Sequence, residues 1–325
     1  PSFIGYDSST LTNVQRAKHT TIQIPGGGVE RYLQKDDVLG KGTFAAVYKG
    51  VNVSSNEPVA LKTLKDLGSF RQEVCAWHAI ENSHPNVVQF KGACADSQTI
   101  VLELIPGMEL FDLVNRIAKP LREKHTRSIL DQILHGVSHL HANGVAHLDL
   151  KLENVIVGQN GVVKLIDMGL CHVYKRKPDG VIDVCRLTAP RGSVSYIAPE
   201  IWSGGYDGFG ADVFAVGVMA YALTHKSFPF LSTEPGRCRI YAHARKADKY
   251  VSDSQRAVQG IVQCIYACTQ TEDVQPKHTS RCLHFINAAL STEEADRASV
   301  AELLTHTYLM RGEADERKRP RENSE

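Results

Sequence analysis

Short runs rich in β-branched and apolar residues dominate the first third of the chain. We expect β-strands in four of them, which are VYKGVNV (47–53), PVALKTL (58–64), NVVQFKGA (86–93) and TIVLELI (99–105). Between the second and third runs, apolar residues recur every three to four positions, with Phe70, Val74 and Trp77 on one face. This spacing predicts a helix over residues 70–80, so a small sheet with one main helix is expected here.

From Leu110 onward the pattern becomes mostly helical. The segment HTRSILDQILHGVSHLHANG (125–144) has helical spacing, and a long apolar helix is expected to begin near Asp212. A small sheet-rich part therefore precedes a larger helical part, with the Ile-Pro-Gly segment 105–107 between them. The predicted fold class is α+β with two lobes.

The two ends of the chain differ from its middle. Residues 1–30 are polar and end in Pro-Gly-Gly-Gly, which predicts a flexible N-terminal extension. Residues 311–325 form a charged tail, which we interpret first as solvated and second as carrying a nuclear localisation signal at 317–321. The region between them, 31–310, is predicted to be a single domain.

The overall composition excludes several classes of partner. The chain is 42% hydrophobic and 22% charged, as is usual for soluble globular proteins. A net charge of +1 gives no reason to expect nucleic acid as a partner. The longest apolar run, 214–223, is about half as long as a membrane span, so no membrane insertion is expected. The 8 cysteines follow no export signal, which favours reduced thiols in the cytoplasm, with the nucleus as a second location.

Two segments of the sheet-rich part are candidates for binding phosphates. In LGKGTFAAVYKG (39–50), Gly40 and Gly42 allow backbone N–H groups to approach a phosphate chain closely. Taken alone, this segment fits a plain β-turn better. In PVALK (58–62), Lys62 ends an apolar strand, and an ion pair with Glu73 would direct its ammonium group at phosphates. The alternative is a surface lysine beside a solvated glutamate.

Three segments of the helical part carry further candidate chemistry. In HLDLKLENV (147–155), Asp149 can accept a hydroxyl proton and Lys151 can balance the charge of a phosphoryl group. Asn154 in the same segment offers an oxygen to magnesium, and Asp167 in VKLIDMGL can chelate that ion. The third segment is SYIAPE (195–200).

In order and spacing, these segments resemble the signature set of eukaryotic-type protein kinases of the serine/threonine class, from about Tyr32 to Leu309. The resemblance implies the bilobal protein-kinase fold. Its N-lobe, 31–104, has a small antiparallel β-sheet and one main helix, and its larger C-lobe, 107–310, is mostly helical. Lys151, two residues after Asp149, and the pair Gly192-Ser193 favour the serine/threonine class over the tyrosine class.

The resemblance also implies roles for individual residues. Asp149 would be the catalytic base with Lys151 as its partner. Lys62, paired with Glu73, would hold the phosphates, and Asn154 and Asp167 would bind two magnesium ions. The implied ATP-binding residues are Leu39, Gly40, Lys41, Gly42, Thr43, Phe44, Ala45, Ala46, Val47, Ala60, Lys62, Leu102, Glu103, Ile105, Glu109 and Ile156.

Three further residues have expected supporting roles. Arg297 is expected to pair with Glu200, and Asp212 to brace the catalytic loop.

The implied function is transfer of the ATP γ-phosphoryl group to a serine or threonine hydroxyl of a protein substrate, with a regulatory protein as a further partner. The alternative is a pseudokinase scaffold that binds ATP or partners without turnover. Pseudokinases typically lose equivalents of Lys62, Asp149 or Asp167, and this chain keeps all three. A small-molecule kinase is disfavoured by the SYIAPE segment, which builds a platform for a peptide.

The chain departs from the family pattern at several positions. Leu148 replaces the usual arginine, so we expect activity that needs no phosphate on the activation segment, which is residues 167–200. Within it, Thr188 and Ser193 are interpreted first as exposed loop residues and second as regulatory sites. The stretch 235–282 reads as an insert. For Cys264, Cys268, Cys282 and His284, buried free cysteines are favoured over a zinc site.

Overall fold

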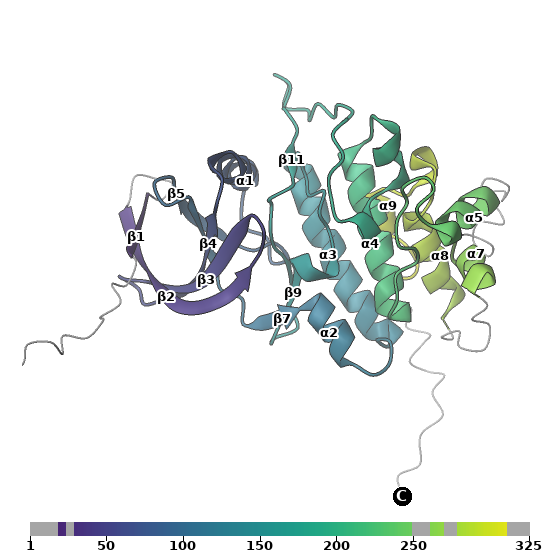
Figure 1. Cartoon of the computed structure of the whole chain (residues 1–325), viewed down its shortest axis with the longest axis horizontal. Helices are drawn as coiled ribbons and strands as arrows, with labels where there is room; N and C mark the ends of the chain where they lie inside the picture. The colour runs from purple at the N-terminus through teal and green to yellow at the C-terminus, as the bar shows by residue number, and fades with distance from the viewer. Residues whose placement is uncertain (1–18, 24–28, 249–260, 270–277, 311–325) are drawn as a thin grey trace, which may run out of the picture. The chain divides into compact units, whose positions relative to one another are not determined.

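The computed structural model describes residues 19–23, 29–248, 261–269 and 278–310 (Figure 1). The chain divides into two compact units. The first unit is residues 1–70 with 90–104, and the second is residues 71–89 with 105–325.

The first unit is an antiparallel sheet with strand order β1-β2-β3-β4-β6-β5. The sheet closes on itself because β1 pairs with β5 at Gln23 and Ala93. The strands are β1 (His19–Gln23), β2 (Val29–Lys41), β3 (Ala45–Asn52), β4 (Pro58–Leu64), β5 (Phe90–Cys94) and β6 (Thr99–Glu103).

The core of the first unit lies along the central strand β4. Val59 and Leu61 are fully buried and cluster with Tyr32 and Val101. The bulky β-branched and leucine side chains of PVALKTL therefore form a strand that is buried on both faces.

The N-terminal extension was predicted to be flexible over residues 1–30, and part of this prediction is wrong. Residues 19–23 form β1, and β2 begins at Val29. The backbone of β1 pairs with β2 from His19 opposite Leu33 to Gln23 opposite Val29, which satisfies hydrogen-bonding groups that a flexible chain would expose. The rest of the extension and the tail 311–325 lie outside the described residues.

The second unit is mostly helical, as predicted. Its helices are α1 (Leu67–Ala79, of which 71–79 belong to this unit), α2 (Leu110–Arg116), α3 (Glu123–Ala142), α4 (Gly208–His225), α5 (Arg239–Asp248), α7 (Ile261–Thr269), α8 (Ser280–Ala289) and α9 (Val300–Leu304). Its short strands are β7 (Gly107–Glu109), β8 (Val145–Ala146), β9 (Val155–Gly158), β10 (Val163–Leu165) and β11 (His172–Val173).

Helix α4 is the centre of the second unit. All of its residues from Ala211 to Thr224 are buried, and it lies beside α3 and α8 (Figure 1). A side chain in place of Gly217 would meet Leu290 at 2.9 Å, so glycine is required for this close approach. The Asp207 side chain accepts a hydrogen bond from the Phe209 N–H at 3.0 Å and begins the helix.

No helix among the described residues is both long enough and apolar enough to cross a membrane. Of the insert 235–282, the structure describes residues 235–248, which include α5, residues 261–269, which form α7, and residues 278–282.

Candidate functional site

The glycine-rich segment of the first unit is the β2–β3 hairpin. The Gly42 N–H donates to the Ala45 carbonyl at 2.8 Å and closes the turn. The Lys65 ammonium donates to the Thr43 carbonyl at 2.8 Å and to the Gly42 carbonyl at 3.2 Å, which holds the tip. A side chain at Gly40 would meet only open space, so the backbone there is accessible to a ligand.

Cross-strand register places four predicted nucleotide-binding residues on one face of this sheet. Val47 lies opposite Lys62 on β4, and Ala60, two residues earlier on β4, lies opposite Leu102 on β6. Side chains of cross-strand partners and of every second residue share a face, so these four side chains form one surface. Lys62 is only 6% exposed, so this surface carries a buried lysine side chain.

The predicted Lys62–Glu73 pair stays a prediction. Lys62 belongs to the first unit, whereas Glu73 on α1 belongs to the second. Ile105 is also in the second unit, whereas Glu103 is in the first.

In the second unit, the loop between β8 and β9 carries the predicted base. Asp212 of α4 holds this loop, because its Oδ1 accepts from the Leu148 N–H and its Oδ2 accepts from the His147 N–H, each at 2.8 Å. The His141 Nε2 lies 2.8 Å from the same Oδ2. Asp212 is 1% exposed, so the predicted bracing role is confirmed by buried, charge-assisted hydrogen bonds.

The backbone at Leu148 is in the left-handed region, with φ at 60°. This conformation is rare for leucine and persists where surrounding contacts impose it. Here the left-handed conformation is held by the two hydrogen bonds that the Asp212 carboxylate accepts from the backbone N–H groups of His147 and Leu148. Gly192 lies against the same residue: a side chain on it would come within 2.8 Å of the Leu148 carbonyl, and its φ is 109°. Only glycine fits at position 192.

Asp149 is the centre of a hydrogen-bonded group. Its Oδ2 accepts from the Lys151 ammonium at 2.7 Å, and its Oδ1 accepts from the Ser193 hydroxyl at 2.8 Å. Lys151 also donates to the Ser193 oxygen at 3.0 Å. The Asn154 amide Nδ2 donates to the Asp149 carbonyl at 2.8 Å and to Oδ2 at 3.1 Å. The structure thus brings Asp149, Lys151 and Asn154 together.

Ser193 is the residue of this group whose contacts the sequence did not predict. We interpreted it first as an exposed loop residue, and this is wrong: it is half-buried and bonded to both Asp149 and Lys151. The pair Gly192-Ser193 was the available signal, but nothing local connects it to a loop more than forty residues earlier. Thr188, in contrast, is exposed as expected.

The predicted magnesium ligands lie at one end of the β9–β10 hairpin. Val155 pairs with Leu165, and the Ile166 N–H donates to the Asn154 carbonyl at 3.0 Å. Asp167 is the next residue, with φ at 69°, and its Oδ1 accepts from the Gly169 N–H at 2.8 Å. The hairpin therefore places Asn154 and Asp167 at the same edge.

Glu109 and Ile156 are cross-strand partners on β7 and β9. Burial raises the pKa of the Glu109 carboxyl, and the nearby carboxylates of Asp112 and Glu153 raise it further. This cluster of acidic groups favours a basic group of a ligand.

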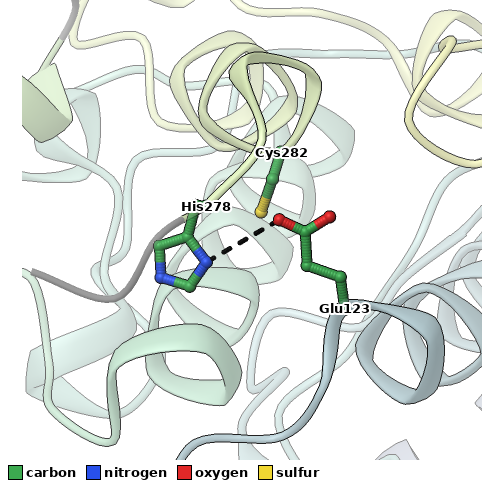
Figure 2. A group of neighbouring side chains, drawn as sticks. All are labelled: Glu123, His278 and Cys282. Atoms are coloured by element: carbon green, nitrogen blue, oxygen red, sulfur yellow. Dashed lines mark ion pairs between the residues drawn. The ribbon is translucent and has the colours of Figure 1, made fainter. Parts of the chain in front are cut away.

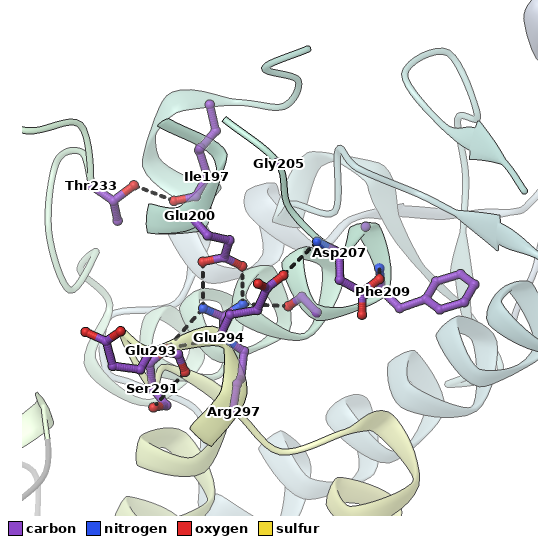
Figure 3. Close-up of polar contacts among 12 residues, drawn as sticks. Ile197, Glu200, Gly205, Asp207, Phe209, Thr233, Ser291, Glu293, Glu294 and Arg297 are labelled. Atoms are coloured by element: carbon purple, nitrogen blue, oxygen red, sulfur yellow. Dashed lines mark hydrogen bonds and ion pairs between the residues drawn. The ribbon is translucent and has the colours of Figure 1, made fainter. Parts of the chain in front are cut away.

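Glu200 and Arg297 form the predicted pair, which is confirmed (Figure 3). The guanidinium donates to Glu200 Oε2 at 2.9 Å and to Oε1 at 2.5 Å, and the arginine side chain is 1% exposed. It also donates to the carbonyls of Ser291, at 3.1 Å, and Gly210, at 3.0 Å. This bidentate pair fixes the end of the SYIAPE segment to the helical unit.

Arg191 ties two parts of the activation segment together. Its Nη1 donates to the carbonyls of Cys171, at 2.9 Å, and Leu170, at 3.2 Å. The Gln72 amide donates to the same Cys171 carbonyl at 3.2 Å. Met168 is fully buried just before these residues.

The later part of the activation segment is held at Tyr206 and Arg186. The Tyr206 hydroxyl donates to the Ala189 carbonyl at 2.9 Å, and the backbones of Leu187 and Tyr206 pair. The Arg186 guanidinium lies 2.7 Å from Glu294. These contacts need no phosphate group.

Comparison with known proteins shows what this chain resembles. A family model described as the protein kinase domain matches residues 33–309. CBL-interacting serine/threonine-protein kinase 9 of Arabidopsis thaliana is 31% identical over 286 residues, which is 84% of this chain and 57% of that protein. Maternal embryonic leucine zipper kinase of Danio rerio is 32% identical over 290 residues, covering 87% of this chain and 38% of that protein. The chain spans about half the length of the curated relatives it matches.

Proposed function

The chain belongs to the protein kinase family, and from this premise we propose that it transfers the ATP γ-phosphoryl group to serine or threonine hydroxyls of proteins. The observation that carries the proposal is the hydrogen-bonded group of Asp149, Lys151 and Ser193. A carboxylate held on both oxygens is oriented for one task, which here is to accept the proton of an attacking hydroxyl. Lys151 supplies positive charge beside it.

Phosphoryl transfer requires little covalent catalysis by the protein. Phosphoryl transfer depends mainly on placing the nucleophile in line and on stabilising charge that spreads over the phosphate oxygens. Asp149 orients the hydroxyl and takes its proton. Lys62 and Lys151 stabilise the phosphate charge, and the open space beside Gly40 admits the phosphate chain.

Magnesium is the cofactor that protein kinases in general use together with ATP. The residues present fit such an ion. Within the described residues, both side-chain hydrogen bonds of Asn154 are donated by Nδ2, which leaves Oδ1 as a neutral oxygen ligand. Asp167 adds the carboxylate, and we propose that these two residues hold two ions. When bound, magnesium offsets the negative charge of the phosphates.

Loss of the Asp167 carboxylate should remove the effect of magnesium on nucleotide binding. We expect Asp167→Ala to bind ATP with nearly the same Kd with and without magnesium, whereas the unchanged chain binds more tightly with it. Isothermal titration calorimetry measures both constants. Asp96→Ala, which removes an exposed carboxylate of the first unit, should keep the full effect. Unchanged tightening in Asp167→Ala would remove this residue from the metal site.

The proposed activity is tested with the purified chain, magnesium and γ-labelled ATP on arrays of serine, threonine and tyrosine peptides. We expect label on serine and threonine peptides, with a preference for basic residues that can meet Glu109, Asp112 and Glu153. The pseudokinase alternative predicts that ATP and magnesium raise Tm without any transfer of label. Label on tyrosine peptides alone would overturn the assigned class.

Activity should not depend on phosphorylation of the activation segment. Leu148 has no donor for a phosphate, and Arg191 and Tyr206 already hold the segment. We expect phosphatase-treated protein, made in a host without related kinases, to keep its peptide-kinase activity. A silent protein that recovers more than about tenfold once Thr188 is phosphorylated would contradict this, because tenfold is about 1.4 kcal/mol in barrier. Phosphate on Ser193 is expected to inhibit, since it would face the Asp149 carboxylate.

We propose protein substrates with serine or threonine acceptors and a regulatory partner protein. One relative is named CBL-interacting serine/threonine-protein kinase 9, which is a precedent for binding a partner protein. The proposed location is the cytoplasm, with the nucleus second.

A further inference from the structure

Three side chains from separate places in the second unit converge in Figure 2: Glu123, His278 and Cys282. Glu123 is the first residue of α3, His278 precedes α8, and Cys282 lies in the first turn of α8. One carboxylate oxygen, one imidazole nitrogen and the thiol sulfur all lie within 4.8 Å of one another. Cys282 is fully buried, and the His278 side chain is 6% exposed.

The backbone around this cluster is fixed by Thr279. Its N–H donates to Glu123 Oε1 at 2.7 Å, and its hydroxyl donates to Glu123 Oε2 at 3.1 Å. The same hydroxyl accepts from the Cys282 N–H at 3.3 Å and caps α8. Thr279 therefore fixes the Glu123 carboxylate relative to the start of α8. His278 and Cys282 lie on either side of Thr279 in the sequence.

The spacing of the three groups suits an ion better than direct contact. His278 Nδ1 lies 3.9 Å from Glu123 Oε1, which is too long for a hydrogen bond. Ligand atoms about 2.0–2.3 Å from a tetrahedral zinc ion lie roughly 3.3–3.7 Å apart. A small inward movement would bring the three groups to that spacing.

We propose that Glu123, His278 and Cys282 bind one zinc ion, with water in the fourth position. Carboxylate, imidazole and thiolate are the three ligand types that zinc takes in proteins. The ion would fasten the start of α3 to the start of α8, a structural role that is separate from Asp149 and its partners.

These ligands differ from the set considered from the sequence. His284 Nδ1 lies 2.5 Å from His306 Nε2, with the two rings stacked, so it is engaged elsewhere. The side chains of Cys264 and Cys268 lie outside the described residues. Cys282 is a buried free cysteine, as expected, but its neighbours are Glu123 and His278.

The proposal is tested by titrating the whole chain, stripped with a chelator, with Co²⁺, whose thiolate complexes absorb in the near ultraviolet. We expect one equivalent to bind with that absorption, and Zn²⁺ to displace it and raise Tm. Cys282→Ser and His278→Ala should each weaken binding at least about a hundredfold, because even residues that only orient a ligand contribute 10–100-fold. Cys75→Ser and Cys185→Ser, which alter exposed cysteines, and His284→Ala should bind as the unchanged chain does.

Glu123→Gln keeps the side-chain size and guards against variants that fail to fold. It should retain the circular dichroism of the unchanged chain while losing the Zn²⁺-dependent rise in Tm. Three outcomes would overturn the proposal: no Co²⁺ binding, an absorption that survives loss of Cys282, or one that is lost only in the Cys264→Ser/Cys268→Ser chain. In the first case the cluster is a hydrogen-bonded contact between α3 and α8 without an ion.

Discussion

Asp149→Asn is expected to lower the turnover of peptide phosphorylation at least about a hundredfold, the low end for loss of a general base. The amide of asparagine has nearly the size of the carboxylate, and its oxygen can still accept from the Ser193 hydroxyl, as Asp149 Oδ1 does at 2.8 Å. It cannot take a proton from the substrate hydroxyl. Steady-state kinetics should show the loss in kcat, with KM for ATP nearly unchanged.

The control for this variant is Asp179→Asn, which makes the same chemical change at an exposed position of the activation segment. It should keep kcat within about twofold, since the asparagine oxygen can still accept from the Val181 N–H, as Asp179 Oδ1 does at 3.0 Å, and surface substitutions have small effects. Both proteins should show the Tm of the unchanged chain. A kcat for Asp149→Asn within a few-fold of the original would remove Asp149 from the role of base.

Arg297→Leu is expected to lower the free energy of unfolding by about 3–5 kcal/mol, the usual effect of removing one partner of a buried ion pair. Glu200 would remain with a side chain only 11% exposed and no cation beside it. The carbonyls of Ser291 and Gly210 would also lose a donor. Urea denaturation measures the change as a lower midpoint with an unchanged slope.

Arg186→Leu is the matched control for this prediction. Its guanidinium lies 2.7 Å from Glu294, but the arginine is 56% exposed, so its loss should change the free energy of unfolding by less than about 1 kcal/mol. In the double variant Glu200→Leu/Arg297→Leu no buried charge is left alone, and part of the stability should return. If Arg186→Leu and Arg297→Leu lowered the free energy of unfolding equally, burial would not be what makes the Glu200–Arg297 ion pair stronger.

The elements that the sequence predicted well are those whose signal is local. PVALKTL coincides with β4, because buried apolar residues at strand length leave few alternatives. The helix predicted for 70–80 is found at Leu67–Ala79. Asp149, Lys151 and Asn154 lie within six residues of one another, so one loop was enough to bring them together.

The parts that the sequence did not predict depend on contacts between distant segments. Ser193 reaches Asp149 only because the Glu200–Arg297 pair and the close approach of Gly192 to Leu148 position its loop. The sequence favoured buried free cysteines over a zinc site that includes both Cys282 and His284, and the geometry of α8 adds a reason. Cys282 and His284 are two residues apart on α8 and point in different directions, whereas groups one turn apart can meet.

Strand β1 affects where the chain can be truncated without exposing the edges of the sheet. A fragment that begins where the family match begins, at residue 33, would lack β1 and the start of β2. The backbone donors and acceptors of β2 and β5 that β1 covers would then be exposed along two open strand edges. Open edges invite pairing with a second chain, so such a fragment should self-associate where the longer protein stays dispersed. We therefore expect β1 and the start of β2, which lie before the recognised family boundary, to protect the sheet against such self-association.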